Sequence, residues 1–176
     1  MPQLDFDISA ALTADTQSAF DAAIKALEAP LAGWREAPLP HFTLPEKTDD
    51  LPDLRDMAAD MAVAFARVIV LGTGGSSLGA QVLAQIHGWG TPPGQSRGPQ
   101  LLFADNLDAT SMAQLLMPEE LSDTGFLVVS KSGGTAETMM QLCCVLPALE
   151  AARLEPARHI FGICGTGDVV FRRLAH

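Results

Sequence analysis

Basic residues are scarce in this sequence, and their scarcity excludes whole classes of partner. The 176 residues include 11 Lys and Arg against 21 Asp and Glu, which gives a formal net charge of -10. So acidic a chain repels nucleic acid and anionic membrane surfaces, because both are bound through clustered cations. A small anion such as a phosphate group is still an allowed ligand, since a few local donors at the start of a helix can hold it.

Long hydrophobic runs are also missing. Apolar residues make up 48% of the chain and charged residues 18%, a composition typical of globular proteins. Apolar runs such as residues 68–71 are far shorter than the roughly 20 residues that cross a bilayer. Residues 1–7 contain neither a basic region nor an apolar stretch, so no secretory or transit peptide is expected and the predicted location is the cytoplasm.

Cysteine is rare, and its spacing supports neither a zinc site nor a redox site. Cys143 and Cys144 are adjacent, Cys164 stands apart, and no C-x-x-C pattern occurs. We expect three reduced thiols that pack in the interior. The length of 176 residues suits one domain, or one domain with an appended arm.

Residues 1–50 are predicted to form that arm, with a helix followed by a Pro-rich connector. Thr13 or Asp15 can cap the helix, which is expected to end near Pro30. Its apolar residues recur at helical spacing, as Phe20, Ile24, Leu27 and Leu31. No run of β-branched residues occurs in this part of the chain, so no strand is expected there.

Residues 51–176 are predicted to form an α/β domain. A helix with the apolar stripe Leu54, Met57, Ala58, Met61 and Phe65 leads into strands that alternate with helices. The predicted strands cover residues 68–71, 101–104, 125–130 and 159–164, and the predicted helices cover residues 78–86, 110–116 and 135–152. Continuous apolar strands separated by helices indicate a doubly wound parallel sheet, covered on both faces. Ligands of such sheets bind beyond the carboxyl ends of the strands.

The last residues, 171–176, look like the opening turns of a further helix, and no stop signal precedes His176. We therefore expect the chain to be the front part of a longer polypeptide. The α/β domain is accordingly expected to be incomplete at its C-terminal end.

A glycine-rich turn over residues 72–79 follows the first predicted strand. Its glycines permit close approach of the backbone to a ligand, and Ser76 and Ser77 can cap the next helix or contact that ligand. The spacing misses the dinucleotide pattern G-x-G-x-x-G, which needs glycine at position 77, and no G-K-[ST] follows for a Walker loop. A nicotinamide site and a tight turn without a ligand stay as alternatives.

A second glycine-rich turn follows the third predicted strand and contains more side chains that can bind a ligand. Its sequence is Ser130-Lys131-Ser132-Gly133-Gly134-Thr135-Ala136-Glu137-Thr138. Three hydroxyls, one ammonium group and two glycine amides converge there at the start of a helix, where they can bind a phosphate monoester. Capping by Ser132 or Thr135, supported by Glu137, is the alternative, but it leaves the lysine and the other hydroxyls unused.

The two turns together resemble the first sugar-isomerase (SIS) domain of the glucose-6-phosphate isomerase (phosphoglucose isomerase) family. The similar segments are Gly74-Gly75-Ser76-Ser77-Leu78-Gly79, Asp105-Asn106-Leu107-Asp108 and Ser130 to Thr138. The pattern S-x-S-G-x-T-x-E is common to phosphosugar-binding SIS proteins, whereas Lys131, Thr138 and the preceding G-G-S-x-L-G point to the isomerase branch. Thr73, Ser77 and the Gly133-Gly134 pair depart from the residues usual in that family.

The resemblance implies an SIS-type, flavodoxin-like three-layer αβα fold. It also implies the interconversion of glucose 6-phosphate and fructose 6-phosphate in glycolysis and gluconeogenesis, by a cytoplasmic homodimer without metal or organic cofactor. The substrate's phosphate would be bound by Ser130, Lys131, Ser132 and Thr135, and its sugar by Gly75 and Ser76. Glu137 would orient a histidine of the partner subunit used in ring opening.

In the family, the carboxylate that moves the proton between C1 and C2 lies in a later part of the polypeptide, so this chain alone is expected to be inactive. Asp105 and Asp108 are expected to cap a helix rather than to act as bases. We expect His41, His87, His159 and His176 to face solvent or to cap helices, because none has a paired carboxylate motif. Two other functions stay open, a stand-alone SIS module that senses a phosphosugar without catalysis and a nucleotide-binding α/β domain.

Overall fold

The computed structural model describes residues 7–87, 98–166, 170 and 171. The chain divides into two compact units, residues 1–52 and residues 53–176. None of the helices in these described ranges is long and apolar enough to cross a membrane.

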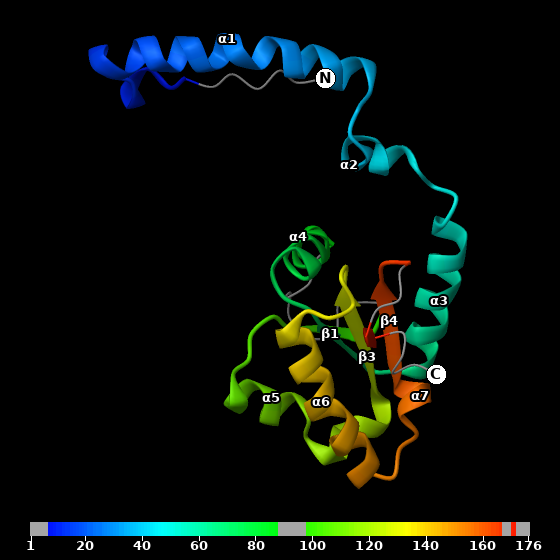
Figure 1. Ribbon diagram of the computed structural model, residues 1–176. Helices are drawn as coiled ribbons and strands as arrows, with labels where there is room; N and C mark the ends of the chain where they lie inside the picture. The colour runs from blue at the N-terminus through cyan, green and yellow to red at the C-terminus, as the bar shows by residue number, and fades with distance from the viewer. Residues whose placement is uncertain (1–6, 88–97, 167–169, 172–176) are drawn as a thin grey trace. The chain divides into compact units, whose positions relative to one another are not determined.

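The first unit is helical in its described part (Figure 1). It contains η1 (Ser9–Ala11), α1 (Ala14–Glu36), α2 (Pro40–Thr43) and η2 (Leu44–Glu46). Thr13 is the N-cap of α1, and its backbone N–H donates to Thr16 Oγ1 at 2.9 Å. The helix runs through Pro30 to Glu36, so the predicted end near Pro30 is wrong. A proline removes one N–H from the hydrogen-bond series, and the strong helix formers around Pro30 outweigh that loss.

The apolar stripe of α1 is not covered. No side chain of α1 is buried, and Ile24, Leu27 and Leu31 are 50%, 46% and 45% exposed. Trp34 meets Phe42 of α2 edge to face, with ring centroids 6.2 Å apart. Capping and intrinsic propensity, rather than burial, therefore account for this helix.

The second unit is built on a four-stranded parallel sheet (Figure 1). Its strands are β1 (Arg67–Leu71), β2 (Gln100–Ala104), β3 (Thr124–Ser130) and β4 (Ile160–Cys164), in the order β2-β1-β3-β4. The connecting helices are α3 (Leu51–Ala64), η3 (Gly74–Ser76), α4 (Leu78–Ile86), α5 (Ala109–Leu115), η4 (Pro118–Asp123), α6 (Ala136–Ala151) and α7 (Pro156–His159). The predicted strands and helices of this unit are confirmed to within one or two residues at their ends.

Strand residues alternate between two apolar layers, as in a doubly wound sheet. On one face, Ile69 and Phe126 belong to a core with Leu142, Val145 and Leu149 of α6. On the other face, Val68 packs with Met61 of α3 and with Phe65 just after it. The predicted three-layer α/β fold is confirmed.

Two expectations about side chains are wrong. His159 is 7% exposed instead of solvent-facing, because its ring packs near Phe65 and its Nδ1 hydrogen-bonds to the Thr124 carbonyl at 2.8 Å. Cys143 and Cys144 are exposed instead of packed, because they lie off the buried face of α6. Of the other histidines, His41 and His87 are exposed as expected, and His176 lies outside the described residues.

Asp108 is the N-cap of α5, as predicted. Its carboxylate makes a pH-dependent contribution to the free energy of unfolding. Hydrogen bonds from the side chain and the backbone of Ser111 lower the pKa of the Asp108 carboxyl below its ordinary 3.8. The backbone bond runs from Ser111 N to Asp108 Oδ2 at 2.7 Å. A lowered pKa in the folded state means that the contribution is present above pH 3.8 and is lost as the pH falls through the folded pKa.

We therefore expect the difference in free energy of unfolding between the wild type and Asp108→Asn to shrink below pH 3.8. Asparagine also caps helices, but it does not titrate, so the variant isolates the charge. Urea unfolding followed by circular dichroism at a series of pH values measures the difference. A difference that stays constant through that range contradicts the role of the ionised carboxylate.

Candidate functional site

The two glycine-rich turns lie at the same edge of the sheet. The 72–79 turn follows β1 and the 130–135 turn follows β3, and these strands are parallel neighbours with Leu71 in register with Val128. The backbone at Gly72 approaches β3 so closely that a Cβ there would lie 3.1 Å from the Val129 carbonyl oxygen. Topology therefore brings the two predicted parts of the site together at the carboxyl ends of adjacent strands.

The three hydroxyls of the 130–135 turn are clustered. Ser130, the last residue of β3, is 2% exposed, and its Oγ lies 2.9 Å from Thr135 Oγ1. Ser132 Oγ lies 3.3 Å from the same Thr135 atom. Thr135 occupies the N-cap position of α6, but its side chain makes no capping hydrogen bond. These hydroxyls are thus directed at one another and not at the backbone of the helix.

The backbone of the 130–135 turn is tight. Gly133 has a φ of 60°, in the left-handed region that favours glycine, and its N–H donates to the Ser130 carbonyl at 2.9 Å. The Gly134 N–H reaches Ser132 Oγ only at 3.4 Å. The helix that follows adds the partial positive charge of its N-terminus, so the whole turn is suited to an anion.

The other predicted site residues lie in the two turns and at the start of α6. Gly75 and Ser76 lie in η3, and Glu137 lies in the first turn of α6. Within the described part of the chain, the side chains of Ser76, Lys131 and Glu137 have no hydrogen-bond or ion-pair partner. They are accordingly available to a ligand or to another part of a larger protein.

Gln141 was not among the predicted site residues, yet it connects α6 to the end of β2 at this edge. Its side chain is fully buried, and its Nε2 donates to the carbonyls of Ala104 at 2.8 Å and Asn106 at 3.3 Å. It thereby joins α6 to the turn that follows β2. The signal in the sequence is weak, because Thr138 and Gln141 are polar members of an otherwise apolar helical stripe.

Gln81 makes a similar connection between the turns after β1 and β2. Its Nε2 donates to Ser77 Oγ at 2.7 Å and to Asp105 Oδ2 at 3.0 Å. Ser77 is fully buried, so its hydroxyl supports the turn and is not open to a ligand. Asp105 accepts this bond and does not cap α5, which corrects the expectation for that residue.

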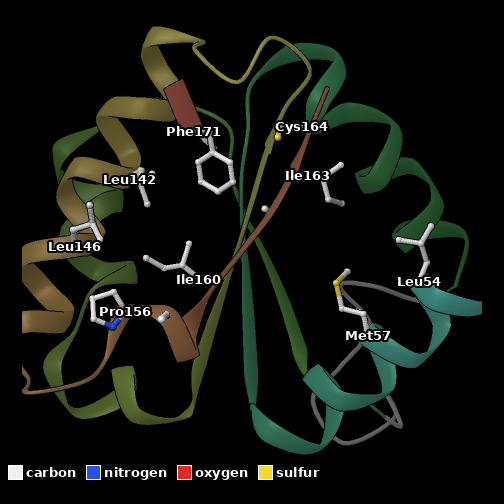
Figure 2. A pocket seen from close by; sticks show the side chains of 11 residues that line it. Leu54, Met57, Leu142, Leu146, Pro156, Ile160, Ile163, Cys164 and Phe171 are labelled. Atoms are coloured by element: carbon white, nitrogen blue, oxygen red, sulfur yellow. The ribbon is translucent and has the colours of Figure 1, made fainter. Parts of the chain in front are cut away.

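An apolar cavity of about 620 Å³ borders β4 (Figure 2). Leu142, Leu146 and Phe171 line it on one side of the strand, and Leu54 and Met57 line it on the other (Figure 2). None of the predicted phosphate ligands lines this cavity. The candidate site is therefore the polar edge formed by the two turns.

The chemistry available at that edge is the binding of an anion. Hydroxyl, amide and ammonium groups are the donors that hold phosphate oxygens. Among the described residues, no three His, Cys, Asp or Glu side chains are grouped so that they could hold a metal ion.

Comparison with known protein families shows to which family the chain belongs. A profile described as "Phosphoglucose isomerase" matches residues 57–161, well over half of the chain, and the matched region includes both glycine-rich turns. The chain belongs to the phosphoglucose isomerase family. The predicted family is thereby confirmed.

Curated members of the phosphoglucose isomerase family are similar to this chain over part of their length. A glucose-6-phosphate isomerase of Geobacter sulfurreducens is 34% identical over 119 residues, which are 66% of this chain and 22% of the relative. A probable glucose-6-phosphate isomerase of Haloquadratum walsbyi is 34% identical over 134 residues, 76% of this chain and 29% of the relative. This chain therefore spans less than a third of the length of either one.

Solved structures are similar to this chain in fold. The crystal structure of a glucose-6-phosphate isomerase from Chlamydia trachomatis matches with a TM-score of 0.58 and 25% identity, covering 68% of this chain and 22% of that one. A hypothetical protein from Thermus thermophilus matches with a TM-score of 0.69 and 25% identity, covering 92% of this chain and 38% of that one.

Proposed function

We propose that this chain is the part of a glucose-6-phosphate isomerase that holds the phosphate group of the substrate. The observation that carries the proposal is the convergence of the Ser130, Ser132 and Thr135 hydroxyls, with both serine oxygens 2.9 to 3.3 Å from that of Thr135, at the start of α6. A phosphate monoester has several acceptor oxygens and would replace these mutual contacts with charge-assisted hydrogen bonds.

The Lys131 ammonium and the N-terminus of α6 would supply the positive charge. Both act over a short range, which matters because the chain as a whole carries a net charge of -10 and repels a dianion at long range. Binding would accordingly depend on local donors, and added salt would screen the attraction between Lys131 and the phosphate group.

The proposed reaction is the interconversion of glucose 6-phosphate and fructose 6-phosphate, in glycolysis and gluconeogenesis. Gly75 and Ser76 would line the sugar, since η3 lies at the same edge of the sheet as the phosphate turn. Glu137 would orient a histidine supplied by the other subunit of a cytoplasmic homodimer. The family membership and the length of the curated relatives support this division of roles.

We also propose that residues 51–176 are an SIS domain that continues in a longer polypeptide. Within the described residues, β4 pairs with β3 alone, and the apolar cavity borders it on both faces. Such an edge is one to which further structure of the same protein could be added.

The proposed site is tested by titrating fructose 6-phosphate into the chain by calorimetry. Ser132→Ala or Thr135→Ala removes one charge-assisted hydrogen bond, so the affinity should fall about ten- to a hundredfold. Lys131→Ala should have a similar effect and should also reduce the dependence of the affinity on salt. Ser122→Ala, at an exposed serine of η4, is the matched control and should bind like the wild type.

Fructose without the phosphate group should bind far more weakly than fructose 6-phosphate. An unchanged affinity in Ser132→Ala and Thr135→Ala would count against the assignment of the phosphate site. Tighter binding of NAD or ATP than of fructose 6-phosphate would favour a nucleotide-binding domain instead.

A further inference from the structure

Two residues that follow β4, Gly165 and Phe171, form backbone hydrogen bonds with two carbonyl groups of the 130–135 turn. The Gly165 N–H donates to the Lys131 carbonyl at 3.1 Å, and the Phe171 N–H donates to the Gly133 carbonyl at 3.0 Å. The donors and acceptors are more than 30 residues apart in the sequence, so these are tertiary bonds. They fix alternate peptide groups of the turn to which phosphate binding is assigned.

Both bonds depend on a close approach that a side chain would prevent. A Cβ at Gly165 would lie 2.8 Å from the Lys131 carbonyl oxygen, a backbone atom that cannot move aside without moving the turn. A Cβ at Gly162 would lie 1.8 Å from Phe171 Cε1, because the Phe171 ring packs directly over that glycine. Phe171 is 8% exposed and belongs to the same core as Leu142 (Figure 2).

Because of the geometry of the peptide group, these two bonds also determine the direction of neighbouring N–H groups. In a trans peptide, the carbonyl of one residue and the N–H of the next point in opposite directions. Bonds that hold the Lys131 and Gly133 carbonyls toward the chain after β4 therefore direct the N–H groups of Ser132 and Gly134 away from it. Backbone N–H groups that are directed to one side of a turn can bind an anion.

We propose that Gly165 and Phe171 are positioning residues of the phosphate site. This inference rests on the proposed function. The two residues hold the carbonyl oxygens of the 130–135 turn away from the bound anion and direct two backbone N–H groups toward it. Neither residue needs to touch the ligand. Gly162 supports the position of Phe171, because a side chain at residue 162 would overlap the Phe171 ring.

The test compares Gly165→Ala and Gly162→Ala with the wild type. We expect each to weaken the binding of fructose 6-phosphate about tenfold, measured by calorimetry well below the unfolding temperature. Gly33→Ala is the control, because a Cβ there has nothing within 4 Å, and it should leave the affinity unchanged. A merely structural role would lower the unfolding temperature of the two variants and leave the affinity of the folded protein unaltered.

A second measurement needs no variant and covers the case in which a glycine variant does not fold. In amide NMR spectra of ¹⁵N-labelled wild type, fructose 6-phosphate should shift the Ser132 and Gly134 signals, and the Gly165 and Phe171 amides should stay protected from hydrogen exchange. Unshifted Ser132 and Gly134 signals in the bound protein would overturn the inference.

The outcomes also separate this inference from the proposed function. If the wild type binds no fructose 6-phosphate, both the proposed function and the positioning role are contradicted. If Ser132→Ala weakens binding and Gly165→Ala and Gly162→Ala do not, the phosphate site stands and the positioning role falls. Loss of affinity in all three variants supports both.

Discussion

Gln141→Glu should destabilise the protein strongly, and more at pH 8 than at pH 5. Gln141 is fully buried and donates to the carbonyls of Ala104 and Asn106, at 2.8 and 3.3 Å. A glutamate of the same shape cannot make both bonds, and when ionised it places a buried charge opposite two carbonyl oxygens. We expect the free energy of unfolding to fall by about 3–5 kcal/mol at pH 8, the cost of an uncompensated buried charge.

The pH dependence follows from the pKa of the introduced carboxyl. Burial and the two carbonyls disfavour the charged form, so the folded-state pKa would be raised above the unfolded value of about 4.3. A raised folded-state pKa means that the folded protein retains a proton that the unfolded chain has lost, so stability falls as the pH rises above about 4.3. Urea unfolding at pH 5 and pH 8 measures both values.

Two control variants separate charge from lost hydrogen bonds. Gln141→Leu removes the donors without adding a charge, so it should cost about 1–3 kcal/mol at both pH values. Gln114→Glu, on the exposed surface of α5, should change little at either one. A loss in Gln141→Glu that is the same at pH 5 and pH 8 would contradict the buried contact with the two carbonyls.

The fold was predictable because its determinants are local. Apolar runs such as residues 68–71 and 125–130 are short, contain β-branched residues and adjoin or include glycine, which favours buried strands, and the intervening helices show clear periodicity. Right-handed crossovers then leave few topologies for a parallel sheet. The end of α1 was not predictable in this way, because the cost of Pro30 competes with the propensity of its neighbours, and the two are of similar size.

The candidate site was predictable only where it is continuous in the sequence. Residues 130–138 predict an anion-binding turn from their own composition, because hydroxyl, ammonium and glycine amide groups follow one another there. Gln141 carries only a weak signal, since a buried polar residue is recognised by its partners, and its partners are backbone carbonyls elsewhere in the fold. The bonds from Gly165 and Phe171 join segments more than 30 residues apart, so only the folded structure displays them.

The 176-residue chain should bind fructose 6-phosphate and convert none of it to glucose 6-phosphate. Acceleration requires groups that interact more strongly with the transition state than with the substrate, and an anchor for the phosphate does not supply them. In the described part of the chain, Asp105 and Asp108 are engaged by Gln81 and Ser111. His159 is hydrogen-bonded to Thr124, at the amino end of β3 and away from the 130–135 turn. Among the described residues, the Glu137 carboxylate lies in the first turn of α6, directly after that turn, and orientation is its proposed role.

A coupled assay that detects glucose 6-phosphate measures this directly, with the complete glucose-6-phosphate isomerase of Geobacter sulfurreducens as the positive control. We expect activity from that longer enzyme and none above background from the chain, under conditions where calorimetry shows that the chain is occupied by fructose 6-phosphate. Glu137→Gln should then bind the sugar phosphate like the wild type, because the anchor is formed by the turn before it. Turnover by the chain that disappears in Glu137→Gln would place the catalytic base within these 176 residues, and the proposed division between anchoring and catalysis would be wrong.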